Sequence, residues 1–166
     1  VEIHRNYPAA LGIVADARSS LEDLLAAVDA KPAPPSSESP VTKEIRAAKE
    51  DWRDTVRHLT HSDEMPTNPA RVLREIRRFL PKESLLVVDG GLATHWAGLF
   101  YDVQVPGRGF MPNRGQAAIG CGFPAAMGAK LAAPDKPVVA FVGDGGFCQG
   151  ISELETCVRE NIPVIV

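Results

Sequence analysis

The stretch VVAFVGDGGF, residues 138–147, is an apolar run that ends in a glycine-flanked acid. Five apolar residues in succession, 138–142, suit a central parallel strand that is covered on both faces. A Gly-Asp-Gly-Gly turn at residues 143–146 follows, and residues 151–160 have a helical pattern. Strand, turn and helix in this order predict one βα unit of a parallel sheet, with the turn at the carboxyl end of the strand.

The turn formed by Gly143, Asp144, Gly145 and Gly146 is the strongest candidate for a ligand site. Glycine lets a ligand approach the backbone closely, and the start of the next helix offers unpaired N–H groups to an anion. The Asp144 carboxylate repels a phosphate unless a divalent cation lies between them, and Mg²⁺ binds both kinds of oxygen. The turn therefore predicts a metal-bridged diphosphate with Asp144 as the metal ligand. The competing interpretation is an ordinary βα turn in which Asp144 caps the helix.

The same alternation of strand, turn and helix begins at residue 85. It predicts an α/β fold with a doubly wound parallel sheet, in which ligands bind beyond the carboxyl ends of the strands. Asp89 ends the first strand at this edge, either as a group that supports the ligand or as a turn former. The expected elements are strands at 85–88, 138–142 and 162–166, helices at 92–101, 123–132 and 151–160, and a loop at 111–120.

The first half of the chain has a different organisation. A short strand at 11–14 and a helix capped by Ser19 and Ser20 look like the last βα unit of a preceding α/β domain. Residues 31–40, KPAPPSSESP, hold four prolines and three serines, which is typical of an extended linker. A charged helix is expected at 41–59. The sequence Thr67-Asn68-Pro69 is expected to cap a helix that runs to Phe79, with Pro69 at the first helical position.

Composition and charge exclude several classes of protein. The formal net charge of −3 gives no bulk attraction for nucleic acid or an anionic membrane, and no apolar run is long enough to cross a bilayer. Cys121, Cys148 and Cys157 lack the paired spacing of a structural zinc site, so reduced thiols in a cytoplasmic protein are expected. Both ends look cut, because the chain starts without Met and stops inside an apolar run. We therefore expect a fragment of a longer protein.

A second motif precedes the apolar strand. Residues 115–128 read GQAAIGCGFPAAMG, with a Gly-x-Gly at 120–122 that superficially resembles a dinucleotide-binding turn. No apolar strand directly precedes it, as the dinucleotide fingerprint requires. The structural interpretation is a helix that packs closely on the sheet through small residues. The functional interpretation is a backbone surface that holds a flat ring against the apolar side chain of Ile119.

These segments, in this order, resemble the C-terminal, diphosphate-binding domain of thiamine-diphosphate-dependent enzymes, most closely the acetolactate synthase group of 2-oxo-acid decarboxylases and carboligases. Residues 143–145 match the opening of the family signature, and 153–154 and 161–164 match its continuation. Residues 120–129 match the family's Gly-x-Gly-x-Pro-Ala-Ala-x-Gly-Ala helix start. Residues 5–17 resemble the close of the family's middle domain.

The resemblance implies a role for each matching residue. Asp144 would bind Mg²⁺, and the backbone of Gly143, Gly145 and Gly146 would lie against the diphosphate of thiamine diphosphate. Ile119 would be the apolar pivot that keeps the cofactor bent. The carbonyl oxygen of Ala117 would accept a hydrogen bond from the cofactor's aminopyrimidine. His95 follows the first strand roughly where acetolactate synthases carry a diphosphate-binding turn, but it is offset by about a residue, so a histidine on a helix surface is the alternative.

The resemblance also implies parts that these residues do not supply. A second Mg²⁺ ligand, an Asn, is expected beyond Val166, and the Glu that activates the pyrimidine belongs to a separate N-terminal domain, in the family that of a partner subunit. The expected division is 1–30 as the end of the middle domain, 31–65 as linker and surface helix, and 66–166 as the truncated C-terminal domain. The implied activity is that of a lyase or transferase on 2-oxo acids, in a homo-oligomer, dimer or tetramer, with the fragment alone inactive.

Two other interpretations stay open at this point. One is a nucleotide-binding α/β module of a dehydrogenase, which would need Gly-x-Gly-x-x-Gly directly after a strand. The other is a non-catalytic relic of the same fold.

His58 and His61 lie three residues apart without a third ligand nearby, so a solvated helix end is expected rather than a metal site. The arginines between 71 and 78 are expected to form a solvated face rather than a nucleic-acid patch.

Overall fold

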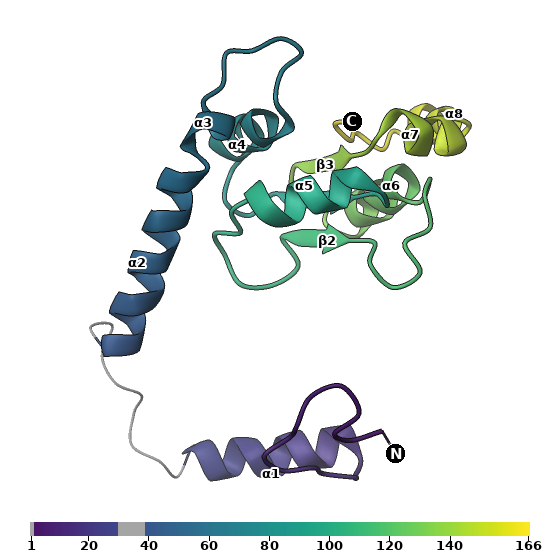
Figure 1. Cartoon of the computed structure of the whole chain (residues 1–166). Coiled ribbons are helices and arrows are strands. Elements are labelled where there is room, and N and C mark those ends of the chain that lie inside the picture. The colour runs from purple at the N-terminus through teal and green to yellow at the C-terminus, as the bar shows by residue number, and fades with distance from the viewer. Residues whose placement is uncertain (1, 30–38) are drawn as a thin grey trace. The chain divides into compact units, whose positions relative to one another are not determined.

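The computed structural model describes residues 2–29 and 39–166, and Figure 1 shows its elements in chain order. The chain forms two compact units, Val1–Glu50 and Asp51–Val166. The predicted linker at 31–40 falls, through residue 38, outside the described residues. The expected domain division at residues 30 and 65 stays a prediction.

In the first unit, the predicted helix forms but the predicted strand does not. Helix α1 spans Ala17–Asp29, and the Ser19 N–H donates to Asp16 Oδ1 at 3.0 Å. Asp16 therefore caps the helix, and the expectation that Ser19 and Ser20 do so is wrong, because an equally good cap precedes them. Residues 11–14 are exposed and form no strand. A strand needs a neighbour for its backbone groups, and no other described segment pairs with this one.

The predicted helix at 41–59 is two helices. Helix α2 spans Pro40–Thr55, and helix α3 spans Arg57–Thr60. The hydroxyl of Ser39 accepts a hydrogen bond from the Thr42 N–H at 3.2 Å and so caps α2. Val56, buried between the two helices with ψ at 4°, interrupts the regular ladder of hydrogen bonds.

The second unit is built on a parallel sheet. Strands β1 (Leu85–Val88), β2 (Phe110–Pro112) and β3 (Val138–Phe141) lie in the order β2-β1-β3, so β1 is central. The prediction missed β2 at the start of the expected loop, since three residues that include a proline carry too little apolar pattern. The expected strand at 162–166 is reduced to a bridge between Ile165 and Val139.

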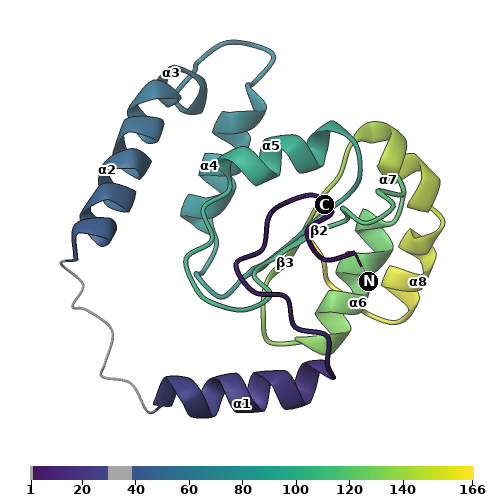
Figure 2. The same cartoon turned by 60° about the horizontal axis from the view of Figure 1, so that its bottom comes forward.

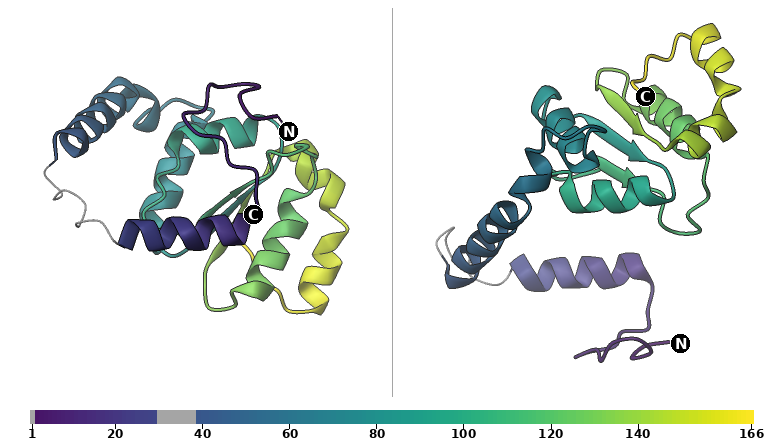
Figure 3. Two further views of the ribbon diagram at one scale, coloured as in Figure 1. Left: turned by 90° about the horizontal axis from the view of Figure 1, so that it is seen from below. Right: turned by 45° about the horizontal axis from the view of Figure 1, so that its top comes forward.

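Helices cover both faces of this sheet, as the left panel of Figure 3 shows. The alternation of side chains along β1 explains why. Leu86 and Val88 pack in one cluster with side chains of α4 (Pro69–Phe79) and α5 (Leu92–Phe100), while Leu85 and Val87 pack in another with side chains of α6 (Gly122–Ala132). Residues from α7 (Asp144–Gly150) and α8 (Glu153–Arg159) join the second cluster. The doubly wound α/β fold is therefore confirmed.

The start of α4 agrees with the prediction. Asn68 Oδ1 accepts a hydrogen bond from the Ala70 N–H at 3.0 Å, and Pro69 occupies the first helical position. Figure 2 shows α4 beside α5, and the side chains of both helices meet in the same apolar cluster. These contacts fix the central strand β1, and with it the carboxyl edge of the sheet where the candidate site lies.

Candidate functional site

The carboxyl ends of β1 and β3 lie side by side. Their register pairs Val88 with Phe141, and the Asp89 N–H donates to the Phe141 carbonyl oxygen at 3.2 Å. The segments after the two strands therefore start next to each other. These segments are the ones in which the sequence predicts a ligand site, at the edge where open α/β sheets bind ligands.

The glycine turn, residues 143–146, is not a loop. Gly143 is the N-cap of α7, and residues 144–146 form the first helical turn, which the Phe147 N–H closes by donating to the Gly143 carbonyl oxygen at 2.8 Å. The prediction that the helix begins at 151 is wrong, since α7 ends at Gly150 and α8 begins at Glu153. Phe147 packs edge-on against Phe123 with ring centroids 5.6 Å apart, and this packing overrides the low helix propensity of glycine.

The geometry of the glycine turn fits a bound anion. A Cβ atom added at Gly143 or Gly145 would meet nothing within 4 Å, so the backbone there is open. Asp144 is exposed at the first position of α7, and its carboxylate makes no hydrogen bond within the described part of the chain. Because Gly143 holds the N-cap position, the interpretation of Asp144 as an ordinary helix cap does not match the structure. The carboxylate is available as an oxygen ligand.

The pivot loop, residues 117–121, lies against the glycine turn. A Cβ added at Gly90 would be 2.7 Å from the Ala117 carbonyl oxygen and 3.3 Å from Ile119 Cγ1. A Cβ added at Gly146 would be 3.4 Å from Ile119 Cγ2. The Ile119 side chain therefore lies between two glycines, one after β1 and one in α7, and 51% of its surface stays exposed. The structure thus brings together Ala117, Ile119 and Gly146, all of which the resemblance assigns to the cofactor site.

The backbone of the pivot loop is in an uncommon conformation. Ala117 has a φ of 53°, and Gly120 has a φ of 96°. The left-handed region is costly for a residue with a Cβ atom, so the surrounding contacts must hold Ala117 there. One such contact is a hydrogen bond of 2.6 Å, in which Asn113 Nδ2 donates to the Ala118 carbonyl oxygen.

For Asp89, the sequence left open whether it supports the ligand or only forms a turn. Its side chain is 1% exposed and accepts hydrogen bonds from the N–H groups of Gly90, Gly120 and Gly122 at 2.8, 2.9 and 3.2 Å. Burial, followed by the negative charge of Asp89, raises the pKa of the Cys121 thiol. In the sequence, Asp89 shows only as an acid after a buried strand, which is also how a turn former appears.

His95 lies apart from these contacts. It is exposed on α5 and lines a surface hollow of about 280 Å³. Other residues of α5, residues of β2, and Arg114, which follows β2, line the same hollow. The structure gives it no hydrogen bond to the glycine turn or the pivot loop within the described residues. Its assignment to the diphosphate stays a prediction.

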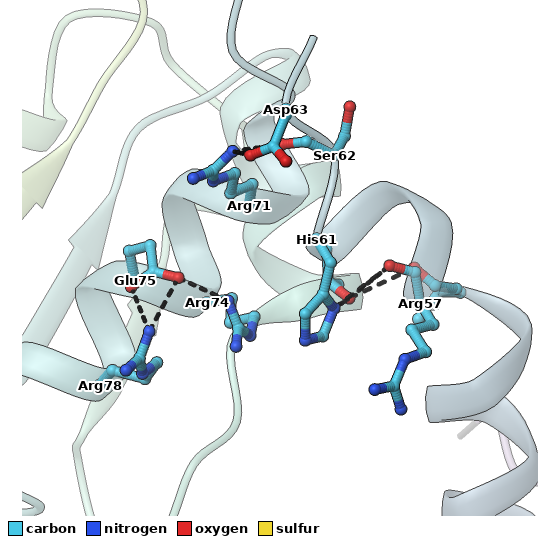
Figure 4. Close-up of polar contacts among 10 residues, drawn as sticks. Arg57, His61, Ser62, Asp63, Arg71, Arg74, Glu75 and Arg78 are labelled. Carbon is cyan, nitrogen blue, oxygen red and sulfur yellow. Dashed lines mark hydrogen bonds and ion pairs between the residues drawn. The ribbon is translucent and has the colours of Figure 1, made fainter.

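The minor candidates behave as solvated groups. His58 Nδ1 lies 3.1 Å from the Thr55 carbonyl oxygen, and Figure 4 shows His61 directed at the Arg57 carbonyl oxygen, 3.2 Å away. Across residues 2–29 and 39–166, no three His, Cys, Asp or Glu side chains form a group that could hold a metal ion. A site centred on Asp144 therefore needs oxygen ligands from the diphosphate, water or another segment.

Three of the four arginines of α4 are paired with acids, as Figure 4 shows. The fourth, Arg77, is buried and pairs with no acid among the described residues, so the expectation of a solvated face is wrong for this arginine. Arg78 Nη1 donates to Glu75 Oε2 at 2.9 Å, Arg74 also pairs with Glu75, and Arg71 pairs with Asp63. Such pairing is what a solvated helix face is expected to show. The Gly-x-Gly at 120–122 begins within the pivot loop, eight residues after β2 ends at Pro112. It therefore does not meet the requirement of a dinucleotide turn, which directly follows a strand. None of the helices in the described ranges combines the length and the apolar character needed to cross a membrane.

The fold and the site together define a cofactor-binding domain of the α/β class, and comparison with known proteins specifies its class. Residues 89–166 match the family described as "Thiamine pyrophosphate enzyme, C-terminal TPP binding domain", in which thiamine pyrophosphate is another name for thiamine diphosphate. The chain is 32% identical to the probable acetolactate synthase large subunit of Methanocaldococcus jannaschii and 31% identical to the large subunit of acetolactate synthase isozyme 3 of Escherichia coli. Each alignment covers 99% of the chain and 28% of the relative.

A solved structure agrees with these sequences. The thiamine-diphosphate-dependent 4-hydroxybenzoylformate decarboxylase of Rhodococcus jostii superposes with a TM-score of 0.51 at 30% identity, covering 58% of this chain and 18% of that one. Residues 89–166 belong to the family of thiamine-diphosphate-dependent enzymes, and the chain is similar to acetolactate synthases over nearly its whole length. It spans a little over a quarter of the length of those synthases.

Proposed function

We propose that this chain forms the diphosphate- and Mg²⁺-binding part of an enzyme that decarboxylates 2-oxo acids and joins the resulting fragment to a second carbonyl compound, as the resemblance to acetolactate synthases implies. The observation that carries the proposal is the meeting of two motifs. The glycine turn and the pivot loop, far apart in sequence, contact each other through Gly146 and Ile119 at the carboxyl edge of the sheet.

The diphosphate end of the proposed site depends on the start of α7. The open backbone at Gly143 and Gly145 leaves room for phosphate oxygens, and Gly146 continues the same helical turn. The exposed carboxylate of Asp144 would bind Mg²⁺, which neutralises the repulsion between the carboxylate and the diphosphate. His95 is a further candidate for the diphosphate, as an exposed side chain of α5.

The ring end of the proposed site depends on the pivot loop. The Ala117 carbonyl oxygen would accept a hydrogen bond from the aminopyrimidine, and the exposed half of Ile119 would press against the bent cofactor. Gly90 and Gly146 support the other half of that side chain, so it cannot retreat toward the sheet. Thiamine diphosphate, when bound, supplies a carbon nucleophile for the keto carbon and a ring that accepts the electrons released with CO₂.

The rest of the proposed enzyme lies outside these residues. The Glu that activates the pyrimidine would come from an N-terminal domain of a partner subunit, and a second Mg²⁺ ligand, an Asn, from beyond Val166. The assembly would be a homo-oligomer, a dimer or tetramer. We also propose a cytoplasmic location, which the three free thiols of Cys121, Cys148 and Cys157 support.

Replacement of Asp144 tests the diphosphate site. In the complete enzyme, Asp144→Ala should remove the Mg²⁺-dependent part of thiamine diphosphate binding, a loss of affinity of about tenfold or more. The fold should stay intact because the carboxylate is exposed and makes no hydrogen bond to any of the described residues. Isothermal titration calorimetry with and without Mg²⁺ measures the effect. Asp135→Ala, an exposed acid that precedes β3 at the opposite edge of the sheet, is the matched control. Unchanged affinity in Asp144→Ala would remove this residue from the site.

A further inference from the structure

Asp89 holds a central place in the candidate site. It directly follows β1, the middle strand, and its backbone is fixed on both sides. Its N–H donates to Phe141 on the β3 side, the Asn113 N–H donates to the Val88 carbonyl oxygen on the β2 side, and the Thr94 hydroxyl donates to the Asp89 carbonyl oxygen. The backbone that carries the carboxylate is therefore held by hydrogen bonds to both neighbouring segments and to Thr94.

The carboxylate connects this strand to the pivot loop. The Gly120 N–H donates to both oxygens, at 3.1 and 2.9 Å, and the Gly122 N–H donates to Oδ1 at 3.2 Å. The Gly90 N–H, directly after Asp89, also donates to Oδ1. Since the side chain is 1% exposed, water cannot easily replace it as the acceptor for these groups. The conformation of the pivot loop thus depends on this side chain, in addition to the hydrogen bond from Asn113.

The same carboxylate also packs against Gly146 of the glycine turn. A Cβ atom at Gly146 would lie 2.0 Å from Asp89 Oδ2, and one at Gly122 would lie 2.6 Å from Asp89 Cβ. Only a residue without a side chain fits at either place. Asp89 therefore packs against the first turn of α7 while it binds the loop that carries Ile119.

We propose that Asp89 is a positioning residue, which sets the spacing between the pivot loop and the glycine turn so that one bent cofactor can reach both. This inference rests on the proposed function. The carboxylate itself would touch neither cofactor nor substrate, because it is enclosed by the groups that it binds. A role limited to stability, such as holding the start of α6, would predict a different pattern of effects.

Amide hydrogen exchange in the unaltered protein gives the first test. The N–H groups of Gly120 and Gly122 should exchange as slowly as those of β1, although Gly120 lies in a loop. Exchange as fast as that of an exposed loop would overturn the proposal without any substitution. In Asp89→Asn, exchange at Gly120 and Gly122 should speed up by about tenfold or more, because one carboxylate oxygen becomes an amide donor.

The pKa of the Cys121 thiol gives a second test that does not depend on enzyme activity. Its Sγ lies 3.8 Å from Asp89 Oδ1, and the carboxylate charge contributes to its raised pKa. In a background in which Cys148 and Cys157 are replaced by Ser and Ala, Asp89→Asn should lower the Cys121 pKa, measured as the pH dependence of alkylation. An unchanged pKa would show that the carboxylate does not lie where the structure puts it.

Turnover in the complete enzyme separates positioning from stability. Asp89→Asn should reduce kcat by about tenfold or more and change the Kd of thiamine diphosphate by less than about threefold, because the diphosphate anchor stays and the ring end shifts. Asp135→Asn, the same chemical change at an exposed site, should alter neither. Equal losses of kcat and affinity, or full turnover, would overturn the positioning role. If the unaltered enzyme binds no thiamine diphosphate, the proposed function fails instead, and the exchange and thiol measurements still judge the contacts of Asp89.

Discussion

The Ile119 side chain has two different sides. One lies against Gly90 and Gly146, and the other, about half of the residue, is exposed. An apolar side chain held in this way on a loop favours the binding of a flat ligand, because the ligand would bury the exposed apolar surface of Ile119. Val or Leu could fill part of the same space, whereas glycine would leave the loop without any surface for a ring.

Replacement of Ile119 tests this role. Ile119→Gly should reduce kcat by about a hundredfold and the affinity for thiamine diphosphate much less, because the bend is lost while the diphosphate anchor remains. Steady-state kinetics of the complete enzyme and calorimetry with the cofactor measure the two quantities. Ile119→Val keeps a branched apolar surface and should restore most of the turnover. Equal losses of turnover and affinity in Ile119→Gly would count against the pivot role.

The end of helix α4 depends on a buried cation. Arg77 is 9% exposed, and its guanidinium donates to the Tyr101 hydroxyl at 2.8 Å and to the Leu80 carbonyl oxygen at 2.7 Å. Its Cζ atom also lies 5.3 Å from the centroid of the Tyr101 ring. These contacts tie the last turn of α4 to the end of α5, so both helices are held on the same face of the sheet.

Removing this cation should loosen the pair of helices. Arg77→Met keeps the apolar stem but loses the charge-assisted hydrogen bonds, and it should lower the free energy of unfolding by about 2 kcal/mol. Arg78→Met, one residue later, removes a guanidinium that is 63% exposed and should change stability by less than about 0.5 kcal/mol. Urea unfolding of both variants measures the difference. Equal effects at the two positions would contradict the importance of burial.

At the scale of the assembled enzyme, the proposed chemistry needs groups that this chain does not supply. Residues 143–146 and 117–121 are proposed to form the diphosphate end and the ring end of the cofactor site, and the resemblance assigns the activating Glu to another domain. The 166-residue chain alone should therefore not turn over pyruvate, and it should bind thiamine diphosphate weakly. An assay for acetolactate formation measures this, with the isozyme 3 synthase of Escherichia coli as the positive control. Turnover by the isolated chain would contradict the proposed division of the site.

Much of the second unit could be predicted from local pattern. The apolar runs at 85–88 and 138–141 are strands, and Asn68 and Pro69 begin α4 as expected. These features depend on residues close together in sequence. The position of Asp144 at the carboxyl edge of the sheet follows from the order of strand and turn alone, because parallel strands place their carboxyl ends together.

Other features depend on contacts that no local pattern reveals. The glycine-rich start of α7 is helical because Phe147 packs on Phe123, and residues 11–14 are not a strand because no described segment pairs with them. Asp89 looks like any acid after a strand, and its role appears only when the chain brings Gly120, Gly122 and Gly146 around it. The amino-acid order was thus sufficient for the type of fold and for the place of the glycine turn at the carboxyl edge of the sheet. The enclosure of one carboxylate between the pivot loop and the first turn of α7 came from packing, because burial and hydrogen-bond partners are properties of neighbours in space.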